Sequence, residues 1–301
     1  MRRTKRDVVF DTVNVILLIL ITFLMIYPLY FTVLASVSNF FAVQNGDVLL
    51  WPVGFTLEAY QNVFRDSTIW RGYVNSIIYT VLGTIYNVSM TVCCAYGLSR
   101  PGLKGKGILN FFFVFTMYFG GGLIPSYLLI KDLGMINTLW VMIIPNGMGV
   151  FNMIITRTFY RSNFSNEIYE AAKIDGATEF RIFFSLALPL SGAIIAVMAL
   201  YNGVGVWNSW FGGLLYITSP DKFPLALVLR TILTKFQDLN VHVTSTAHVT
   251  AEDSYNRMLN KAMQESMRYA LIFISSAPVL MAYPFVQKHF VKGVMIGSLK
   301  G

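Results

Sequence analysis

The sequence predicts an all-α membrane protein that crosses the bilayer six times, and three observations support this fold class. Of the 301 residues, 55% are hydrophobic and only 13% are charged, and the mean hydropathy is +0.58. A soluble domain carries about 25% charged residues, and a core of ordinary size could not bury so much apolar surface. Six long apolar stretches contain none of the 23 basic and 15 acidic residues. The charges between these stretches are distributed unequally.

Each apolar stretch is long enough to cross a membrane, since about 20 helical residues span a hydrocarbon core of roughly 30 Å. The glycines at 120–122 indicate a helix break or close packing within the third stretch. We expect one transmembrane domain over residues 1–301. Its helices are expected at about 13–36, 73–98, 108–130, 138–156, 189–217 and 269–286.

The charges of the connecting segments predict that both termini are cytoplasmic. With that orientation, the inner segments carry 14 of the 23 Lys and Arg residues and a net charge of +8, whereas the outer segments are neutral. Short cytoplasmic segments are enriched in basic residues, so Arg2–Arg6 and Arg100–Lys106 identify the inner side. We therefore expect a multi-pass protein of the cytoplasmic membrane. The inner segments are 1–12, 99–107, 157–188 and 287–301.

The uncharged spans argue against several functions. Proton-coupled transporters and pumps usually need ionisable residues within the membrane, and the three histidines also lie outside the spans. No Gly-rich phosphate loop is present, the carboxylates lack metal-ligand spacing, and the adjacent Cys93 and Cys94 fit no metal site. We expect no catalytic residue, no metal, no cofactor and no nucleic-acid partner. Any uphill transport then needs a partner that supplies energy. An ion-coupled or passive transporter acting alone and an assembly subunit remain alternatives.

The inner segment 166–189, here called the coupling loop, is predicted to form two short amphipathic helices. Glu167 and Glu170 lie in the first turn of the first helix, where the helix dipole favours negative charge. Gly176 can end this helix in a left-handed conformation, and Thr178 can cap the next one. Helical spacing assigns an apolar face to each helix, formed by Ile168, Ala171 and Ala172 in the first and by Phe180, Phe183, Phe184 and Ala187 in the second.

Two interpretations of the coupling loop are open: a helix lying on the lipid interface, and a docking element for a cytoplasmic protein. Interfacial anchors prefer Lys and Arg on their polar face. Here the polar residues are mixed to acidic, which favours a protein partner. They are Glu167, Glu170, Lys173, Asp175, Glu179 and Arg181.

The coupling loop resembles the EAA loop of permeases of ATP-binding-cassette (ABC) importers. The matching residues are Glu170-Ala171-Ala172, Asp175-Gly176-Ala177, Phe183, Leu186 and Leu188-Pro189, with Ala193 where that family often has a proline. The run from Phe290 to Gly301 is similar to the tail of carbohydrate-uptake permeases of the maltose-permease type. The resemblance covers essentially the whole chain and is closest to the oligosaccharide and aldouronate branch.

This resemblance implies a type I ABC importer transmembrane fold and a non-catalytic permease subunit. It also implies a second, homologous permease, two ATPase subunits that bind ATP and Mg²⁺, and an extracytoplasmic solute-binding protein that delivers a carbohydrate, in particular an oligosaccharide. A permease for a non-sugar solute is the alternative. The basic tail at 287–301 would reach the ATPase interface. The residues that the resemblance places in the ATPase-docking loop are Glu167, Glu170, Ala171, Ala172, Asp175, Gly176 and Ala177.

Uncharged polar residues within the spans are candidates for the transport pathway, because polar side chains facing lipid are unfavourable. A sugar needs hydrogen bonds for its hydroxyls and flat apolar surfaces for its ring. The alternative role is helix packing or an aromatic belt at the outer interface. The outer segment 237–266 is interpreted as a variable surface loop or a contact for the solute-binding protein. The pathway candidates are Asn146, Asn152, Trp207, Asn208 and Trp210.

Overall fold

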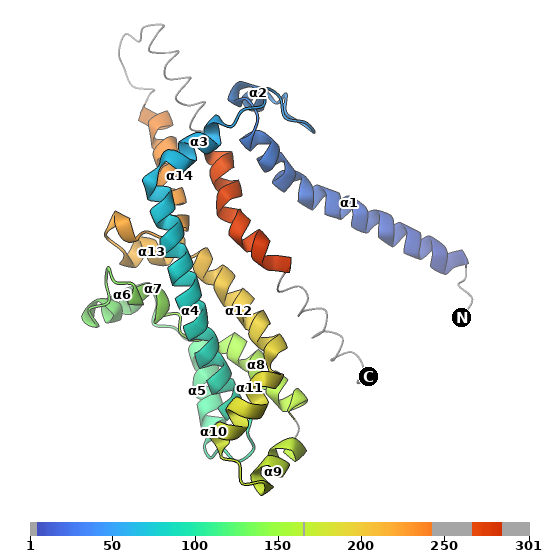
Figure 1. Cartoon of the computed structure of the whole chain (residues 1–301), viewed down its shortest axis with the longest axis vertical. Coiled ribbons are helices and arrows are strands. Elements are labelled where there is room, and N and C mark those ends of the chain that lie inside the picture. Colours follow the sequence, from blue (N-terminus) through green and yellow to red (C-terminus); the bar gives the residue numbers. More distant parts are fainter. Residues whose placement is uncertain (1–4, 165, 243–266, 285–301) are drawn as a thin grey trace. The chain divides into compact units, whose positions relative to one another are not determined.

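The computed structural model describes residues 5–164, 166–242 and 267–284. Helices dominate these ranges and no β-strand occurs in them, which confirms the predicted all-α class. The chain divides into two compact units, Met1–Ser67 with Thr231–Ala277 and Thr68–Arg230 with Pro278–Gly301. Figure 1 shows the helices of both units.

The described residues of the first unit include one long apolar helix near the N-terminus and two short helices after it. Helix α1 (Lys5–Ser36) is long and apolar enough to cross a membrane, and none of its most apolar 18 residues is buried within the chain. A helix that is hydrophobic all round must be covered by lipid or protein. Helices α2 (Phe40–Asn45) and α3 (Glu58–Arg65) follow. The Tyr30 hydroxyl ties α1 to the connecting segment by donating to the Leu50 carbonyl oxygen at 2.6 Å.

Helix α4 (Ser67–Ser99) is the second continuous helix that is long and apolar enough to cross a membrane. Polar side chains near its start hold the turn η2 (Pro220–Lys222). The Asn75 side chain donates to the carbonyl oxygens of Asp221 and Phe223 at 2.8 and 3.1 Å. Helix α14 (Leu225–His242) starts directly after this turn. These contacts fix one end of the second unit.

The third and fourth expected spans are not continuous helices, which corrects the sequence prediction. Helices α5 (Lys106–Tyr118) and α6 (Leu123–Asp132) meet at 112°, and Gly122 at the break has φ +86°. The glycines at 120–122 had indicated such a break. In the fourth, α7 (Trp140–Ile143) and α8 (Val150–Asn163) are separated by a segment with Pro145, which lacks an N–H donor.

The fifth expected span also differs, because its first residues belong to the helix of the coupling loop. That helix runs from Glu179 to Leu190 and turns by 77° at Ser191 into α12 (Gly192–Trp207). A second break at Asn208 and Ser209 precedes α13 (Trp210–Tyr216). The sixth expected span lies partly outside the described residues, which are helical over 267–284.

The described residues contain two continuous helices that could cross a membrane, or four spans if each bent pair counts as one. The number six therefore remains a prediction. The tail at 287–301 and the segment 243–266 lie outside the described residues.

A buried cluster joins α4 and α8 to the coupling loop, at the lower end of the view in Figure 1. Aromatic and aliphatic side chains from α4 and α8 pack against those of the loop helices. This core fixes the position of the loop within the second unit. Its members are Val92, Ala95, Tyr96, Leu98, Met153, Tyr160, Phe164, Ala172, Ile182, Phe183 and Ala187.

Candidate functional site

The first helix of the coupling loop, α9 (Asn166–Ile174), ends in a Schellman motif. The Ala177 N–H donates to the Ala172 carbonyl oxygen, and the Gly176 N–H donates to that of Lys173, both at 3.0 Å. This hydrogen-bond pattern needs a residue with a left-handed backbone conformation directly after the end of the helix. Gly176 supplies it with φ +75°, as the sequence predicts.

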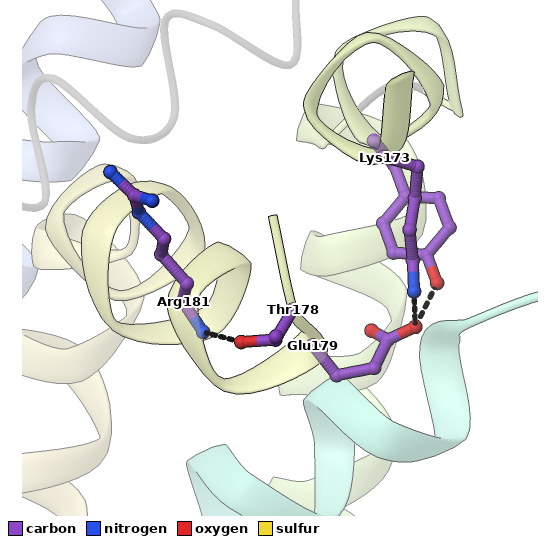
Figure 2. A network of polar contacts seen from close by, with 5 residues as sticks. Lys173, Thr178, Glu179 and Arg181 are labelled. Atoms are coloured by element: carbon purple, nitrogen blue, oxygen red, sulfur yellow. Dashed lines mark hydrogen bonds and ion pairs between the residues drawn. The ribbon is translucent and has the colours of Figure 1, made fainter. Parts of the chain in front are cut away.

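The second helix begins after Thr178, also as predicted. Helix α10 (Glu179–Ile182) continues into the π-helical turn η1 (Phe183–Ala187) and α11 (Leu188–Leu190). The Arg181 N–H donates to Thr178 Oγ1 at 3.4 Å, which caps the helix (Figure 2). A serine or threonine cap of this kind satisfies an N–H that has no partner within the helix.

An ion pair links the two loop helices across Gly176. Lys173 Nζ lies 2.7 Å from Glu179 Oε1, and the Tyr169 hydroxyl donates to the same oxygen (Figure 2). Desolvation raises the pKa of Glu179, but the hydrogen bonds from Lys173 and Tyr169 outweigh it, so this pKa lies below its ordinary value. The hydrogen bond to Glu179 raises the pKa of Lys173. Both side chains are about half exposed, so the pair contributes little to stability.

The apolar faces predicted for the two helices are only partly buried, which corrects that prediction. In the first helix Ala172 is buried, whereas Ile168 and Ala171 are exposed. In the second, Phe183 and Ala187 are buried, whereas Phe180 and Phe184 form a neighbouring i, i+4 row that is 78% and 59% exposed. The core formed by α4 and α8 covers only one such row.

The seven candidate docking residues therefore separate into two groups. Ala172 is buried and Ala177 is partly buried, and both anchor the loop to the core. The remaining five are on the surface: Glu167, Glu170, Ala171, Asp175 and Gly176. Ile174, which the sequence prediction did not include, is 86% exposed beside them. Its position off the apolar face predicted for the first helix is the sequence signal that could have singled it out.

Arg100 is a second residue that the sequence prediction assigned only to orientation. It follows α4 directly and is 6% exposed. Its guanidinium carbon lies 5.0, 4.7 and 5.3 Å from the ring centroids of Tyr96, Phe164 and Tyr169. Guanidinium groups over aromatic rings are attracted by the ring quadrupole. Arg100 thus connects the end of α4 to the end of α8 and to α9.

The structure does not bring the five pathway candidates into one site. Trp207 is buried, and its ring meets that of Tyr73 edge to face at 5.9 Å. The Asn208 side chain donates to the Val204 carbonyl oxygen at 2.9 Å, within its own helix. The Trp210 ring lies 3.9 Å from the Arg230 guanidinium carbon. These contacts match the alternative of helix packing.

The two remaining candidates flank the break between α7 and α8. The Asn146 carbonyl oxygen accepts a hydrogen bond from the buried Asn87 side chain of α4. Asn152 lies in the first turn of α8, where its carbonyl oxygen accepts from the Thr156 hydroxyl at 2.8 Å. The Asn146 contact ties the break to α4, whereas the Asn152 contact lies within α8.

Trp207 also lines an apolar cavity of about 310 Å³ within the second unit. The other four candidates are not among the lining residues. The lining comes from α4, α12 and residues 278–282 and is almost entirely aliphatic, which offers few hydrogen bonds to a sugar. In the described part of the chain, no group of three or more His, Cys, Asp and Glu residues is placed to hold a metal ion.

Comparisons with known proteins agree on one family. The family described as "Binding-protein-dependent transport system inner membrane component" matches residues 67–295. Protein LplC of Bacillus subtilis (strain 168) is 37% identical over 301 residues, which cover 100% of this chain and 98% of that protein. The polygalacturonan/rhamnogalacturonan transport system permease protein YtcP of the same organism is 34% identical and covers 97% of this chain and 98% of its own length.

A solved structure is similar over nearly the same length. It is a bacterial ABC transporter involved in the import of the acidic polysaccharide alginate. One of its chains matches with a TM-score of 0.84 and 30% identity, covering 96% of this chain and 99% of that chain. The similarity includes both the fold and the sequence.

Proposed function

Because this chain belongs to the family of binding-protein-dependent transport system inner membrane components, we propose that it is one of two permease subunits of an ATP-driven carbohydrate importer. The second permease is homologous and completes the pathway. Two ATPase subunits bind ATP and Mg²⁺, and an extracytoplasmic solute-binding protein delivers the sugar. The names of the permease YtcP and of the alginate transporter support a carbohydrate, in particular an oligosaccharide.

The exposed surface of the coupling loop is the observation that carries this proposal. Ile174 and Phe180 are 86% and 78% exposed on a loop that is itself held by a Schellman motif, a capped helix and a buried core. Exposed apolar side chains on an ordered element mark interaction sites. Glu167, Glu170 and Asp175 are exposed acidic residues of the same loop. We assign this surface to the ATPase subunits.

The loop is built to pass a movement of α9 to the membrane helices. Ala172 and Phe183 pack on Tyr96 and Tyr160, so α9 and α10 move with the ends of α4 and α8. Ser191, at the 77° bend before α12, is fully buried, and its hydroxyl lies 2.8 Å from that of Tyr160. Closure of the ATPases would thus reach α4 through the core and α12 through the bend.

The proposed orientation places the coupling loop and both termini in the cytoplasm. The support is the segment 99–107, which holds three basic residues and no acidic one and lies at the same end of the second unit as the coupling loop, through the core of α4, α8 and the loop. The exposed tryptophan Trp51 lies in a segment expected on the outer side.

Site-specific photocross-linking tests the docking role. A photoreactive phenylalanine analogue replaces Phe180 in the assembled transporter, and the matched control carries it at Trp51, which is 77% exposed. We expect Phe180 to cross-link to the ATPase subunits and Trp51 to leave them unlabelled. Cross-linking from Trp51 alone, or lipid adducts in place of ATPase adducts at Phe180, would contradict the proposal.

A further inference from the structure

Basic side chains from α5, from α8 and from the residue that follows α4 lie together where α4 ends and α5 begins. Lys106 Nζ donates to the carbonyl oxygens of Ser99 and Arg100 at 3.2 and 3.0 Å. One turn further along α5, Asn110 Oδ1 accepts a hydrogen bond from Arg157 of α8. Arg161 follows Arg157 by one turn on α8. We call Arg100, Lys106, Arg157 and Arg161 the basic cluster.

The charges of the basic cluster act on one another. Desolvation lowers the pKa of Lys106, and the positive charges of Arg161, Arg157 and Arg100 lower it further. Within the described ranges, no member forms an ion pair with a carboxylate. The charge of Glu179 reaches Arg100, but Glu179 is already bound to Lys173 and Tyr169.

Two hydrogen-bond donors of the basic cluster are buried without a partner. They are Arg100 Nη1 and Arg157 Nε. Arg100 as a whole is 94% buried, since 6% of its surface is exposed. A buried donor on a charged group is unfavourable unless an acceptor binds it. The three rings around Arg100 attract its charge but accept no hydrogen bond from Nη1, so the two unpaired donors among four like charges favour an anion at this place.

We propose that the basic cluster binds the phosphate group of an anionic phospholipid. Guanidinium groups match phosphate oxygens geometrically, and Lys106 adds a point charge at the start of α5. Directly after it, Ile108, Phe111 and Phe112 are 66%, 64% and 59% exposed, which is the surface expected beside acyl chains. A site at the boundary between such a surface and a basic segment lies at headgroup depth.

This lipid site goes beyond the proposed transport function and uses its orientation only to place the lipid in the cytoplasmic leaflet. Basic pockets between membrane helices on that side bind acidic headgroups. A free phosphate shares the chemistry but not the adjoining apolar surface. The lipid would hold α5 and α8 together by neutralising charges that otherwise repel each other.

The test uses the complete transporter in detergent and a phosphatidylglycerol with a photoreactive group near its headgroup. The readout is labelling of the α5 peptide that contains Asn110, measured by mass spectrometry as the lipid concentration rises. The double variant Lys106→Gln/Arg157→Gln should need roughly 30-fold more lipid for half-maximal labelling, at about 5-fold for each lost cation. The matched control Arg71→Gln/Lys131→Gln removes two exposed cations from segments expected on the outer side and should shift labelling less than two-fold.

Competition with the unmodified protein makes the test independent of whether the variants assemble. Unlabelled phosphatidylglycerol should displace the probe at least ten-fold better than phosphatidylcholine with the same acyl chains. Equal displacement by the two lipids, displacement by inorganic phosphate at the same concentration, or absence of labelling would each overturn the proposal. Labelling is a binding measurement, so its result does not depend on sugar uptake.

Discussion

Gly176 sets the angle between the two helices of the coupling loop, and its replacement by alanine tests how strongly that angle matters. A Cβ atom at this position meets no atom within 4 Å, so a steric clash is excluded. The substitution is unfavourable because alanine must adopt φ +75°, which costs an L residue roughly 1–2 kcal/mol. Alanine also makes the unfolded chain stiffer than glycine does, which offsets about 0.4–1 kcal/mol of this cost. The net cost of about 1 kcal/mol lowers the equilibrium constant for forming the Schellman motif about five-fold.

The assay is sugar uptake per ATP hydrolysed by the complete transporter in proteoliposomes. We expect Gly176→Ala to lower this ratio by up to about five-fold and Gly176→Val to lower it further, since a β-branched residue tolerates positive φ worst. Gly176→Asn should stay near the unmodified ratio, because asparagine adopts the left-handed conformation more readily. Gly212→Ala in α13 is the matched control, with open space and no positive φ. Normal coupling in Gly176→Val, or an equal loss in Gly212→Ala, would refute the reasoning.

Three further predictions concern the loop ion pair, the aromatic packing and the outer turn. The pKa of Glu179 is lowered and that of Lys173 is raised, so their contact should be complete at neutral pH. The contact should weaken as the pH falls below the ordinary glutamate pKa of 4.5, and again as the pH rises above the ordinary lysine pKa of 10.5. Hydrogen exchange of α9 should show both changes in the unmodified protein and neither in Glu179→Gln. Trp207→Ala should destabilise the protein by about 3–5 kcal/mol, because it removes a buried ring of α12 that packs on Tyr73 of α4. Trp210→Ala should cost less, and equal shifts of the two variants in thermal unfolding would contradict this prediction. Asn75→Ala removes two hydrogen bonds to the turn at 220–223 and should cost about 1–3 kcal/mol, with faster proteolysis at that turn; unchanged cleavage would show that the turn is held by other contacts.

The features that could be predicted from the sequence depend on short-range backbone chemistry. Gly176 and Thr178 end and begin helices because of their own conformational and hydrogen-bonding properties, whatever surrounds them. The glycines at 120–122 break a helix for the same local reason. Family membership was also accessible, because the spacing of the EAA-type residues is itself a sequence pattern.

The features that could not be predicted depend on which neighbours the fold supplies. Helical spacing places Phe180 and Phe183 on the same apolar face and predicts that both are buried. Only the position of Tyr96 and Tyr160 in the fold decides that Phe183 is the buried one. Pro189 and the Ser191-Gly192 pair are residue types found at helix kinks, but they do not specify the 77° angle of this bend. In the sequence Arg100 is indistinguishable from an ordinary loop cation, because two of the three rings around it, those of Phe164 and Tyr169, come from a distant part of the chain.

The proposed division of labour, in which this chain forms the pathway and its partners supply the energy, can be measured directly by reconstitution. Liposomes contain either this chain alone or the chain with its sister permease and both ATPases, with ATP inside and the solute-binding protein and a panel of oligosaccharides outside. We predict accumulation above the external concentration only in the complete set, and only with ATP. Accumulation against a gradient by the chain alone would contradict the proposal.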